Sequence, residues 1–379
     1  MIYLDNSATT RPYAEVLDTF RKVSELFFAN PSSIHGLGGR SENLLKETRA
    51  QAARLLNVEE SELVFTSGGT EGNNLAIKGV AFQYMSRGKH LITSNSEHPA
   101  TLNAFSQLEA LGFDVTYLPV DEMGQINLDE LLQAIRPDTI LVSLIHVNNE
   151  WGSIQPVEAI GNLLSEYPKI VFHVDHVQGL TKVPLDFKRA RLDLCTMSGH
   201  KIHGPKGTGL LYVRNGLRIS PLFSGGGQEQ DRRSGTENLP GMAGMVKALR
   251  LTLEKEKAGR PHLTKLNRRL RESLGSHPDI ILNSPNDAAP HILNISVLGL
   301  KPEVLIHSLE EEEIFISTKS ACSSRRNAAS HVLLNAGIPE EIAKQAVRIS
   351  LSFENTAEEI DTFLTVFHQK VAKLRQVME

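Results

Sequence analysis

Features that would place this sequence in several specialised protein classes are missing. Its 379 residues include only two cysteines, Cys195 and Cys322, which are too few for the disulfide framework of a small secreted protein. The first residues form neither the basic nor the apolar segment of a secretory signal, so we expect a cytoplasmic protein. No apolar run approaches the roughly 18 residues that a membrane-spanning helix needs, and we expect no membrane contact.

An excess of charge of one sign is also missing. Forty Lys and Arg residues stand against 44 Asp and Glu residues, which gives a formal charge of -4 at pH 7. Without a basic field over the whole molecule, direct binding of nucleic acid is not expected. The remaining composition, 40% hydrophobic and 22% charged, is that of a globular protein, and the length predicts roughly two to three domains.

What the sequence does contain is an alternation of short apolar segments with longer segments of helical period, from about residue 43 onward. This alternation is typical of an α/β fold. Because the strand segments are apolar throughout, we expect a mostly parallel sheet that is covered on both faces. The seven predicted strands are 63–66, 90–93, 114–118, 140–146, 170–174, 194–197 and 209–213.

The composition changes in the charged stretch 254–261, which follows a predicted helix over 242–253 and contains Gly259 and Pro261. We place a domain boundary there, because Gly and Pro commonly end helices and mark connections. Beyond the boundary, helices are mixed with half-buried strands at 291–297 and 346–351. The last helix is predicted to start at the capping box 356–359.

A glycine-rich turn, 67–74, joins the first strand to a helical segment. Backbone N–H groups at Gly69, the helix dipole and the Thr70 hydroxyl would together form a binding site for a phosphate. The turn matches neither the Walker A motif nor the dinucleotide fingerprint. A turn that binds no ligand is the alternative interpretation.

Two further strand ends carry reactive groups. Lys201 follows the strand 194–197 within Ser198–Lys201, where burial among small residues would lower its pKa and free the amine for covalent chemistry. Asp175 ends the strand 170–174 and is suited to accept a bond from a protonated ring nitrogen. His173 and His176 point to opposite sides of that strand, so we predict no metal site.

Other polar residues follow strands of the same sheet. His98 offers a ring that stacks on a flat ligand, or is a structural histidine. Asn148 offers both a donor and an acceptor. The loop 233–238, which includes Thr236, is either a second phosphate-contacting loop or a plain connection.

The two cysteines have different surroundings. Cys322 lies among small hydroxylated residues and three cations, which predicts a mobile, exposed loop that stabilises a thiolate. An incidental loop cysteine is the alternative. Cys195 lies within an apolar strand and is predicted to be inert packing.

Together, a phosphate site, a stacking histidine, a ring-nitrogen aspartate and a strand-end lysine indicate one cofactor, pyridoxal 5'-phosphate (PLP). In this order the motifs resemble those of cysteine desulfurases of the NifS/IscS type, in the class V aminotransferase group of fold-type I PLP enzymes. The resemblance covers almost the whole chain and is carried by the segments 3–10, 30–35, 66–71, 147–150, 173–175, 198–201, 233–236, 320–322 and 347–351.

The resemblance implies a fold-type I transferase with two domains. The large PLP-binding domain would span residues 15–257. A smaller α+β domain, formed by residues 1–14 and 258–379, would carry the catalytic cysteine loop.

The resemblance also implies a role for each matching residue. Lys201 would bond PLP covalently and shuttle protons, Asp175 would keep the ring nitrogen protonated, and His98 would stack on the ring and assist proton transfer. Arg348 would bind the substrate carboxylate. Asn148 and Gln178 would contact the hydroxyl side of the ring, and Asn148 would also contact the substrate. The phosphate would be bound by Gly69, Thr70, Ser198, His200 and, across a homodimer, Thr236 of the partner subunit.

Cys322 would attack the sulfur of bound L-cysteine, so that L-alanine leaves and a persulfide remains on Cys322. The sulfur would pass to an acceptor protein for iron-sulfur cluster assembly or for thiolation of tRNA or a cofactor. A selenocysteine lyase, or another class V PLP lyase that acts without Cys322, is the alternative enzyme. The alternatives without turnover are a PLP-bearing sulfur-transfer scaffold and a nucleotide-binding protein.

The sequence departs from the family's pattern at several positions. His176 stands where these enzymes usually carry a small residue, and Gly179 follows three positions later. Lys319, Arg325 and Arg326 make the cysteine loop more basic than expected. This charge would steer an acidic acceptor, or is surface charge without a partner.

Overall fold

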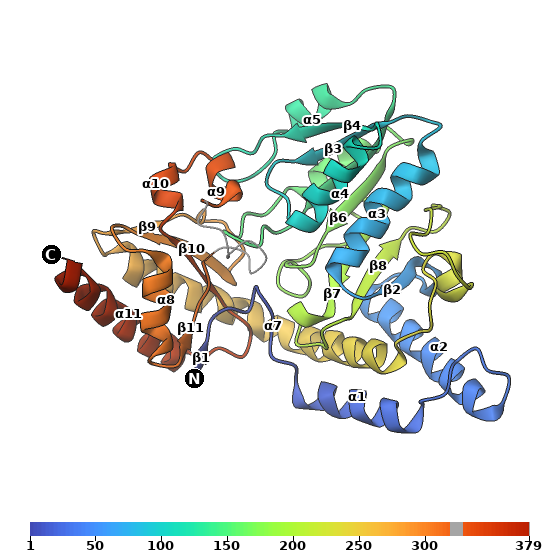
Figure 1. The fold of residues 1–379 in the computed structure, drawn as a ribbon, viewed down its shortest axis with the longest axis horizontal. Coiled ribbons are helices and arrows are strands. Elements are labelled where there is room, and N and C mark those ends of the chain that lie inside the picture. The colour runs from blue at the N-terminus through green and yellow to red at the C-terminus, as the bar shows by residue number, and fades with distance from the viewer. Residues whose placement is uncertain (319–328, 379) are drawn as a thin grey trace.

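The seven strands expected from the sequence form one sheet in the computed structural model of the protein (Figure 1). Its order is β2-β8-β7-β6-β5-β3-β4, with β8 antiparallel to both neighbours and the other pairs parallel. The predicted α/β fold with a mostly parallel seven-stranded sheet is therefore confirmed. The strands are β2 (Leu63–Thr66), β3 (His90–Ser94), β4 (Asp114–Leu118), β5 (Thr139–Ile145), β6 (Val171–Asp175), β7 (Leu194–Ser198) and β8 (Gly209–Val213).

The structure describes residues 1–318 and 329–378. The predictions for Cys322 and for the basic residues around it therefore lie outside the described residues. In the described part of the chain, no helix combines the length and the apolar character that crossing a bilayer would require.

Helices cover both faces of the sheet because side chains alternate along each strand. Val64 of β2 packs in a core shared with α3 (Gly69–Tyr84) and α4 (Pro99–Glu109). Its neighbours Leu63 and Phe65 pack in the opposite core, shared with α2 (Gly36–Leu56), α6 (Val157–Leu164) and α7 (Leu239–Gly275). The short helix α5 (Leu128–Ala134) lies near the edge strand β4.

A second lobe is built around two small sheets (Figure 1). The N-terminal strand β1 (Ile2–Tyr3) pairs with β11 (Ile314–Phe315), and Leu4 packs in the core of this lobe, so the chain's beginning joins its C-terminal part. The three-stranded sheet has the order β12-β10-β9, all antiparallel. The other elements of the chain are α1 (Ala14–Leu26), β9 (Ile280–Leu282), β10 (Ile292–Val297), α8 (Pro302–Glu310), α9 (His331–Asn335), α10 (Glu340–Ala343), β12 (Ala346–Ser350) and α11 (Ala357–Met378).

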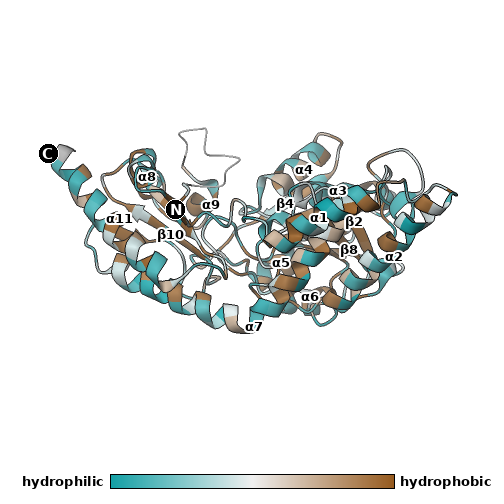
Figure 2. Cartoon of the chain, turned by 90° about the horizontal axis from the view of Figure 1, so that it is seen from below, coloured by the Kyte–Doolittle hydropathy of each residue, from teal (hydrophilic) through white to brown (hydrophobic). Residues whose placement is uncertain are grey.

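The helix predicted over 242–253 does not end there: α7 continues through Gly259 and Pro261 and passes along both lobes (Figure 2). Both lobes bury a part of it, through Leu249 in one core and Leu270 in the other. Gly259 is present for close packing, since a Cβ atom there would lie 2.4 Å from Phe353 Cδ1. The packing therefore overrides the sequence signals for a helix end, and the division at residues 257 and 258 stays a prediction.

Candidate active site

A cavity of about 170 Å³ lies where the carboxyl ends of the parallel strands meet the N-terminal segment and β12. This is the edge at which open α/β sheets bind ligands. All the predicted cofactor residues except Asn148 and Thr236 line it, together with Arg348. The lining is formed by Ser7, Ala8, Gly69, Thr70, Asn73, His98, Ile145, Asn149, Asp175, Val177, Gln178, Ser198, His200, Lys201 and Arg348.

The glycine-rich turn forms one wall of this cavity. Helix α3 begins at Gly69, so the first backbone N–H groups of a 16-residue helix face the site. A Cβ atom on Gly69 would lie 2.8 Å from Val177 Cγ2, so the close approach of the chain requires glycine. The Ser198 hydroxyl lies beside this turn, buried and without a hydrogen-bond partner among the described residues. These groups are suited to binding an anion.

Lys201 lies in the 3-10 turn Gly199–Lys201 directly after β7. Its Nζ donates to the carbonyl oxygens of Ser7 and Ala8, the latter at 2.9 Å. Burial, and then the positive charges of Arg348 and Lys182, lower the pKa of Lys201 to about 7. A large fraction of the amine is therefore unprotonated near neutral pH, as a nucleophilic lysine requires.

Asp175 ends β6 and is 4% exposed. Its Oδ1 accepts a hydrogen bond from the backbone N–H of Val177 at 3.0 Å, and its Oδ2 accepts one from Asn73 Nδ2 at 2.6 Å. No cation of the described chain forms an ion pair with Asp175 within 4.0 Å, so a positively charged ligand atom would be its natural partner.

Asn73 is a site residue that we did not predict. It follows Gly69 by one turn of α3, and residues four apart lie on the same helix face. The presence of Gly69 in the phosphate turn was therefore a signal that Asn73 would face the same cavity.

His98 caps the N-terminus of α4. The backbone N–H of Ala100 donates to His98 Nδ1 at 3.1 Å, which leaves Nε2 as the protonated nitrogen of the neutral ring. Burial is the main cause that lowers the pKa of His98. The ring is therefore uncharged near neutral pH and carries one donor proton at Nε2.

The N-terminal segment closes another side of the cavity. Gln178 Nε2 donates to the carbonyl oxygen of Ser7 at 2.9 Å, while Gln178 Oε1 and Ser7 Oγ are buried without a partner among the described residues. His200 Nδ1 lies 3.2 Å from Thr9 Oγ1, and burial lowers the pKa of His200 to about 3. Two polar atoms are thus left for a ligand.

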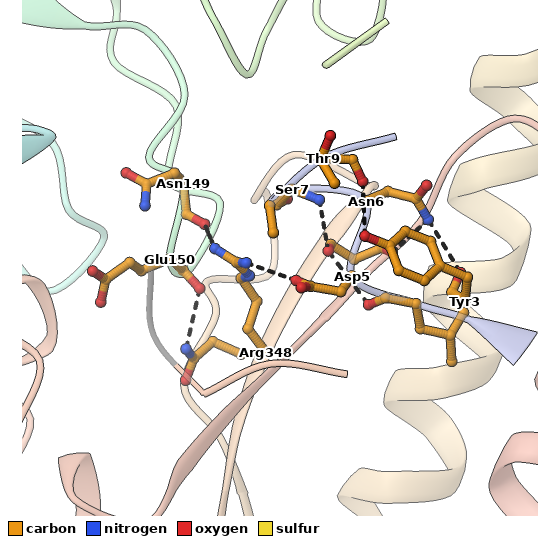
Figure 3. Close-up of polar contacts among 12 residues, drawn as sticks. Tyr3, Asp5, Asn6, Ser7, Thr9, Asn149, Glu150 and Arg348 are labelled. Carbon is orange, nitrogen blue, oxygen red and sulfur yellow. Dashed lines mark hydrogen bonds and ion pairs between the residues drawn. The ribbon is translucent and has the colours of Figure 1, made fainter. Parts of the chain in front are cut away.

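Arg348 on β12 connects the two lobes, as Figure 3 shows. Its guanidinium donates to the Asn149 carbonyl at 2.7 Å and to Asp5 Oδ1 at 2.8 Å, and its Nε is buried without a partner in the described chain. The Arg348 side chain is 1% exposed and that of Asp5 is 19% exposed. Asp5 is a second site residue that we did not predict, because 343 residues separate it from Arg348 and no spacing rule joins them.

Comparison with known proteins agrees with this geometry. The family model "Aminotransferase class-V" matches residues 2–363. A "NifS/IcsS protein homolog" of Lactobacillus delbrueckii subsp. bulgaricus is 46% identical over all of this chain and all of that protein. The "Cysteine desulfurase IscS" of Methanosarcina thermophila is 45% identical over 99% of this chain and 93% of that protein.

The chain belongs to the NifS/IscS cysteine desulfurases of the class V aminotransferase family. The predicted resemblance is confirmed. A solved structure titled "NIFS-LIKE PROTEIN" matches with a TM-score of 0.92 at 36% identity, over 98% of this chain and 99% of that one. Another, titled "SspA in complex with cysteine", matches with a TM-score of 0.82 at 36% identity, over 94% of this chain and 100% of that one.

Asn148, which we predicted from this family to contact cofactor and substrate, does not line the cavity. Its Nδ2 donates to the Ser96 carbonyl at 2.9 Å, and its Oδ1 accepts from the backbone N–H groups of Glu150 and Trp151. These bonds hold the turn after β5. The neighbouring residue, Asn149, is the one that borders the cavity.

Thr236 is exposed and lies outside the cavity of its own chain. The preceding Arg233 forms an ion pair with Glu71 of α3 at 2.8 Å, which holds this loop near the phosphate turn. The prediction that Thr236 reaches the site of a partner subunit stays a prediction.

The described residues on both sides of 319–328 form hydrogen bonds with Arg348, which lines the cavity, or with residues next in sequence to its lining. On one side, the backbones of Ser317 and Arg348 exchange two hydrogen bonds. On the other side, the Ser330 hydroxyl donates to Glu150 Oε2, and His331 Nε2 lies 3.4 Å from the Glu97 carbonyl. The described residues on either side of 319–328 are thus fixed by these hydrogen bonds. Cys195, by contrast, is fully buried, and burial raises its pKa, which confirms the prediction of inert packing.

The two departures from the family pattern at His176 and Gly179 depend on each other. His176 Nδ1 lies 2.8 Å from His146 Nδ1, and burial lowers the pKa of both rings, that of His146 to about 4. A Cβ atom on Gly179 would lie 2.5 Å from the His176 ring and 2.9 Å from His146 Nδ1. Glycine therefore provides the space that the additional histidine occupies.

Metal ligands are not gathered anywhere in residues 1–318 and 329–378: no group of three or more His, Cys, Asp or Glu residues there is placed to hold an ion. The orphaned hydroxyl of Ser198 and the glycine-lined wall at Gly69 fit a phosphate instead, and the Asp175 carboxylate fits a protonated ring nitrogen. The described residues are thus compatible with PLP.

Proposed function

We propose that this protein is a PLP-dependent L-cysteine desulfurase that converts L-cysteine to L-alanine and leaves a persulfide on Cys322. The observation that supports the proposal most strongly is the position of Lys201. Its amine, shifted toward the neutral form, borders the same cavity as Asp175, His98 and the anion-binding turn, in a chain of the NifS/IscS family.

Each part of PLP has suitable partners in the cavity. Gly69, Thr70, Ser198 and His200 would bind its phosphate, and Asp175 would bind its ring nitrogen. His98 would stack on the ring, Gln178 would contact the ring hydroxyl, and Lys201 would bond the aldehyde carbon. When bound, PLP supplies an electron-withdrawing ring that stabilises negative charge on the substrate carbon.

The chain's own residues then have distinct tasks. Arg348 binds the substrate carboxylate through its planar guanidinium, whose orientation Asp5 fixes. Lys201 Nζ accepts and returns the substrate's Cα proton. His98 Nε2, the protonated nitrogen of a neutral ring, donates a proton on the other side of the site.

Sulfur transfer is the task of Cys322. Its thiolate attacks the sulfur of bound cysteine, a new sulfur-sulfur bond forms and the carbon-sulfur bond breaks. The carbon takes a proton and leaves as L-alanine, so atoms and electrons balance without an external oxidant. The attached ends of the segment, at Ser317 and Ser330, support the idea that Cys322 reaches the cavity.

The persulfide would then pass to a sulfur-acceptor protein in the cytoplasm, serving iron-sulfur cluster assembly or the thiolation of tRNA or a cofactor. The basic residues around Cys322 in the sequence, Lys319, Arg325 and Arg326, favour an acceptor with an acidic surface.

A homodimer is part of the proposal, because Thr236 is exposed in its own chain. The region around α1 supports it, since Leu17, Phe28 and Ile34 expose 54%, 73% and 107% of their surface. Light scattering should give twice the monomer mass.

The decisive experiment compares four proteins: wild type, Lys201→Ala, Cys322→Ala and Cys195→Ala. We expect the visible absorption of bound PLP in all except Lys201→Ala. With L-cysteine and a thiol reductant, alanine formation should be lost in Cys322→Ala and retained in Cys195→Ala, since Cys195 is buried away from the site.

Other outcomes have defined meanings. Alanine formation that survives in Cys322→Ala rejects the persulfide mechanism and favours a lyase such as selenocysteine lyase. PLP binding without any alanine formation by wild type rejects the enzyme and leaves the sulfur-transfer scaffold. Absorption that persists in Lys201→Ala, and that borohydride still fixes to the chain, moves the covalent bond to another amine.

A further inference from the structure

A second lysine, Lys182, is buried directly behind the lysine of the proposed site. It is 4% exposed, and its Nζ donates to the backbone carbonyl of Lys201 at 2.9 Å. Among the described residues no carboxylate lies within ion-pairing distance of this ammonium. A buried, unpaired ammonium is costly, so its presence here requires a reason beyond packing.

The backbone is strained at the position that delivers Lys182. The neighbouring Thr181 has φ of 67°, a left-handed conformation that is unfavourable for a β-branched residue, and its buried hydroxyl has no partner in the described chain. Backbone N–H groups of Lys182 and Val183 donate to the Gly179 carbonyl and fix this tight turn. This strained turn thus positions the Lys182 ammonium next to the Lys201 carbonyl.

The surroundings of Lys182 leave its charge unbalanced. The titratable groups that face it are four neutral histidines and the lysine of the site: His176, His200, His203, His291 and Lys201. Burial lowers the pKa of Lys182 to about 8, so it remains mostly protonated at pH 7. The charged or titratable groups around Lys201 itself are Asp5, His98, Asp175, Lys182, His200 and Arg348.

We propose that Lys182 is a positioning residue for the reaction: its ammonium holds the Lys201 carbonyl, and its positive charge favours the unprotonated form of the nitrogen at Lys201. This inference rests on the proposed function, in which that nitrogen would bond the aldehyde carbon of PLP. A like charge nearby is one of the known ways to activate a lysine. Arg348 adds a second positive charge from the other lobe.

The test is a pH titration of the visible absorption of bound PLP in the holoenzyme. Lys182→Met removes the charge and the donor, Lys182→Gln keeps a donor but is uncharged, and Lys182→Arg keeps both. Lys188→Met removes an equal charge from an exposed position in the same connection and is the matched control. Loss of the buried charge lets the Lys201 nitrogen hold its proton more readily, so the midpoint should move up by about one pH unit in the two neutral variants.

We expect Lys182→Arg and Lys188→Met to keep the wild-type midpoint within a few tenths of a pH unit. A wild-type midpoint in both neutral variants, or an equal shift in Lys182→Arg, overturns the inference and leaves Lys182 a purely structural residue. Where Lys182→Met does not fold, Lys182→Gln decides the question because it preserves the bond to the carbonyl. Failure of the proposed function is distinguishable, since it would appear as PLP absorption in Lys201→Ala that borohydride still fixes to the chain.

Discussion

The two sides of the cavity are built differently. On the side of the large sheet, Asp175 and His98 accept hydrogen bonds from the Asn73 amide and the Ala100 backbone N–H, and Lys201 donates to the Ala8 carbonyl. On the side of the second lobe, the Arg348 guanidinium forms an ion pair with Asp5 and donates to the Asn149 carbonyl. Within the described part of the chain, the three residues on the sheet side are held by hydrogen bonds without an ion pair, whereas the buried cation Arg348 has one carboxylate as its counter-charge.

The sharpest test of this difference is Asp5→Ala. Removing one partner leaves the Arg348 guanidinium buried and uncompensated, which should lower the free energy of unfolding by about 3 kcal/mol. Unfolding in denaturant measures this free energy. Asp18→Ala, which breaks an exposed pair with Arg21 on α1, is the control and should leave the midpoint unchanged. An unchanged midpoint in Asp5→Ala would remove the distinction between the two sides.

A smaller loss is expected from Gly179→Ala on the sheet side, because the new methyl group would overlap the His176 ring. We expect about 1–3 kcal/mol of destabilisation in wild type and much less in a His176→Ala background. Chemical denaturation of the two single variants and the double variant gives the coupling. Equal costs in both backgrounds would show that the glycine and the histidine are independent.

Asn73→Ala tests whether contacts on the sheet side are individually weak. It removes the donor to Asp175 Oδ2 and should cost about 1–2 kcal/mol. Asn74→Ala, one position further along α3, is the control, since Asn74 bonds only the backbone of its own helix among the described residues. A loss as large as that of Asp5→Ala would show that one contact on the sheet side contributes as much stability as the Asp5–Arg348 pair.

The smallest effect concerns pH. Burial raises the pKa of Glu97 from 4.5 to about 8, so the folded protein keeps a proton there that the unfolded chain releases. Stability from this group therefore falls as pH rises from about 4.5 to 8. At pH 8, Glu97→Gln should melt a few degrees above wild type, whereas at pH 4.5 the two proteins should melt at the same temperature. The exposed variant Glu122→Gln should show no such trend. A constant difference across this range would contradict the assignment.

The site residues on the side of the large sheet could be predicted from the sequence because local sequence features position them. Polar residues end or follow β3, β6 and β7, and parallel strands bring their carboxyl ends to one edge, so Asp175, His98 and Lys201 were expected together. The position of Asn148 outside the cavity lining could not be predicted, because the turn after β5 offers two adjacent asparagines and only packing decides which one faces the cavity.

The other lobe could not be predicted in the same way. The partnership of Asp5 with Arg348 follows from pairing between the two ends of the chain, which no local spacing encodes. The helix end expected near Gly259 failed for a related reason, since the contact with Phe353 that requires this glycine lies far along the sequence.

The continuity of α7 has a consequence for how the molecule comes apart. One helix supplies Leu249 to the first hydrophobic core and Leu270 to the second. Unfolding of either core would therefore remove part of the packing surface of the other. The two lobes should consequently lose their structure in a single cooperative transition, and a heat-capacity trace should contain one peak.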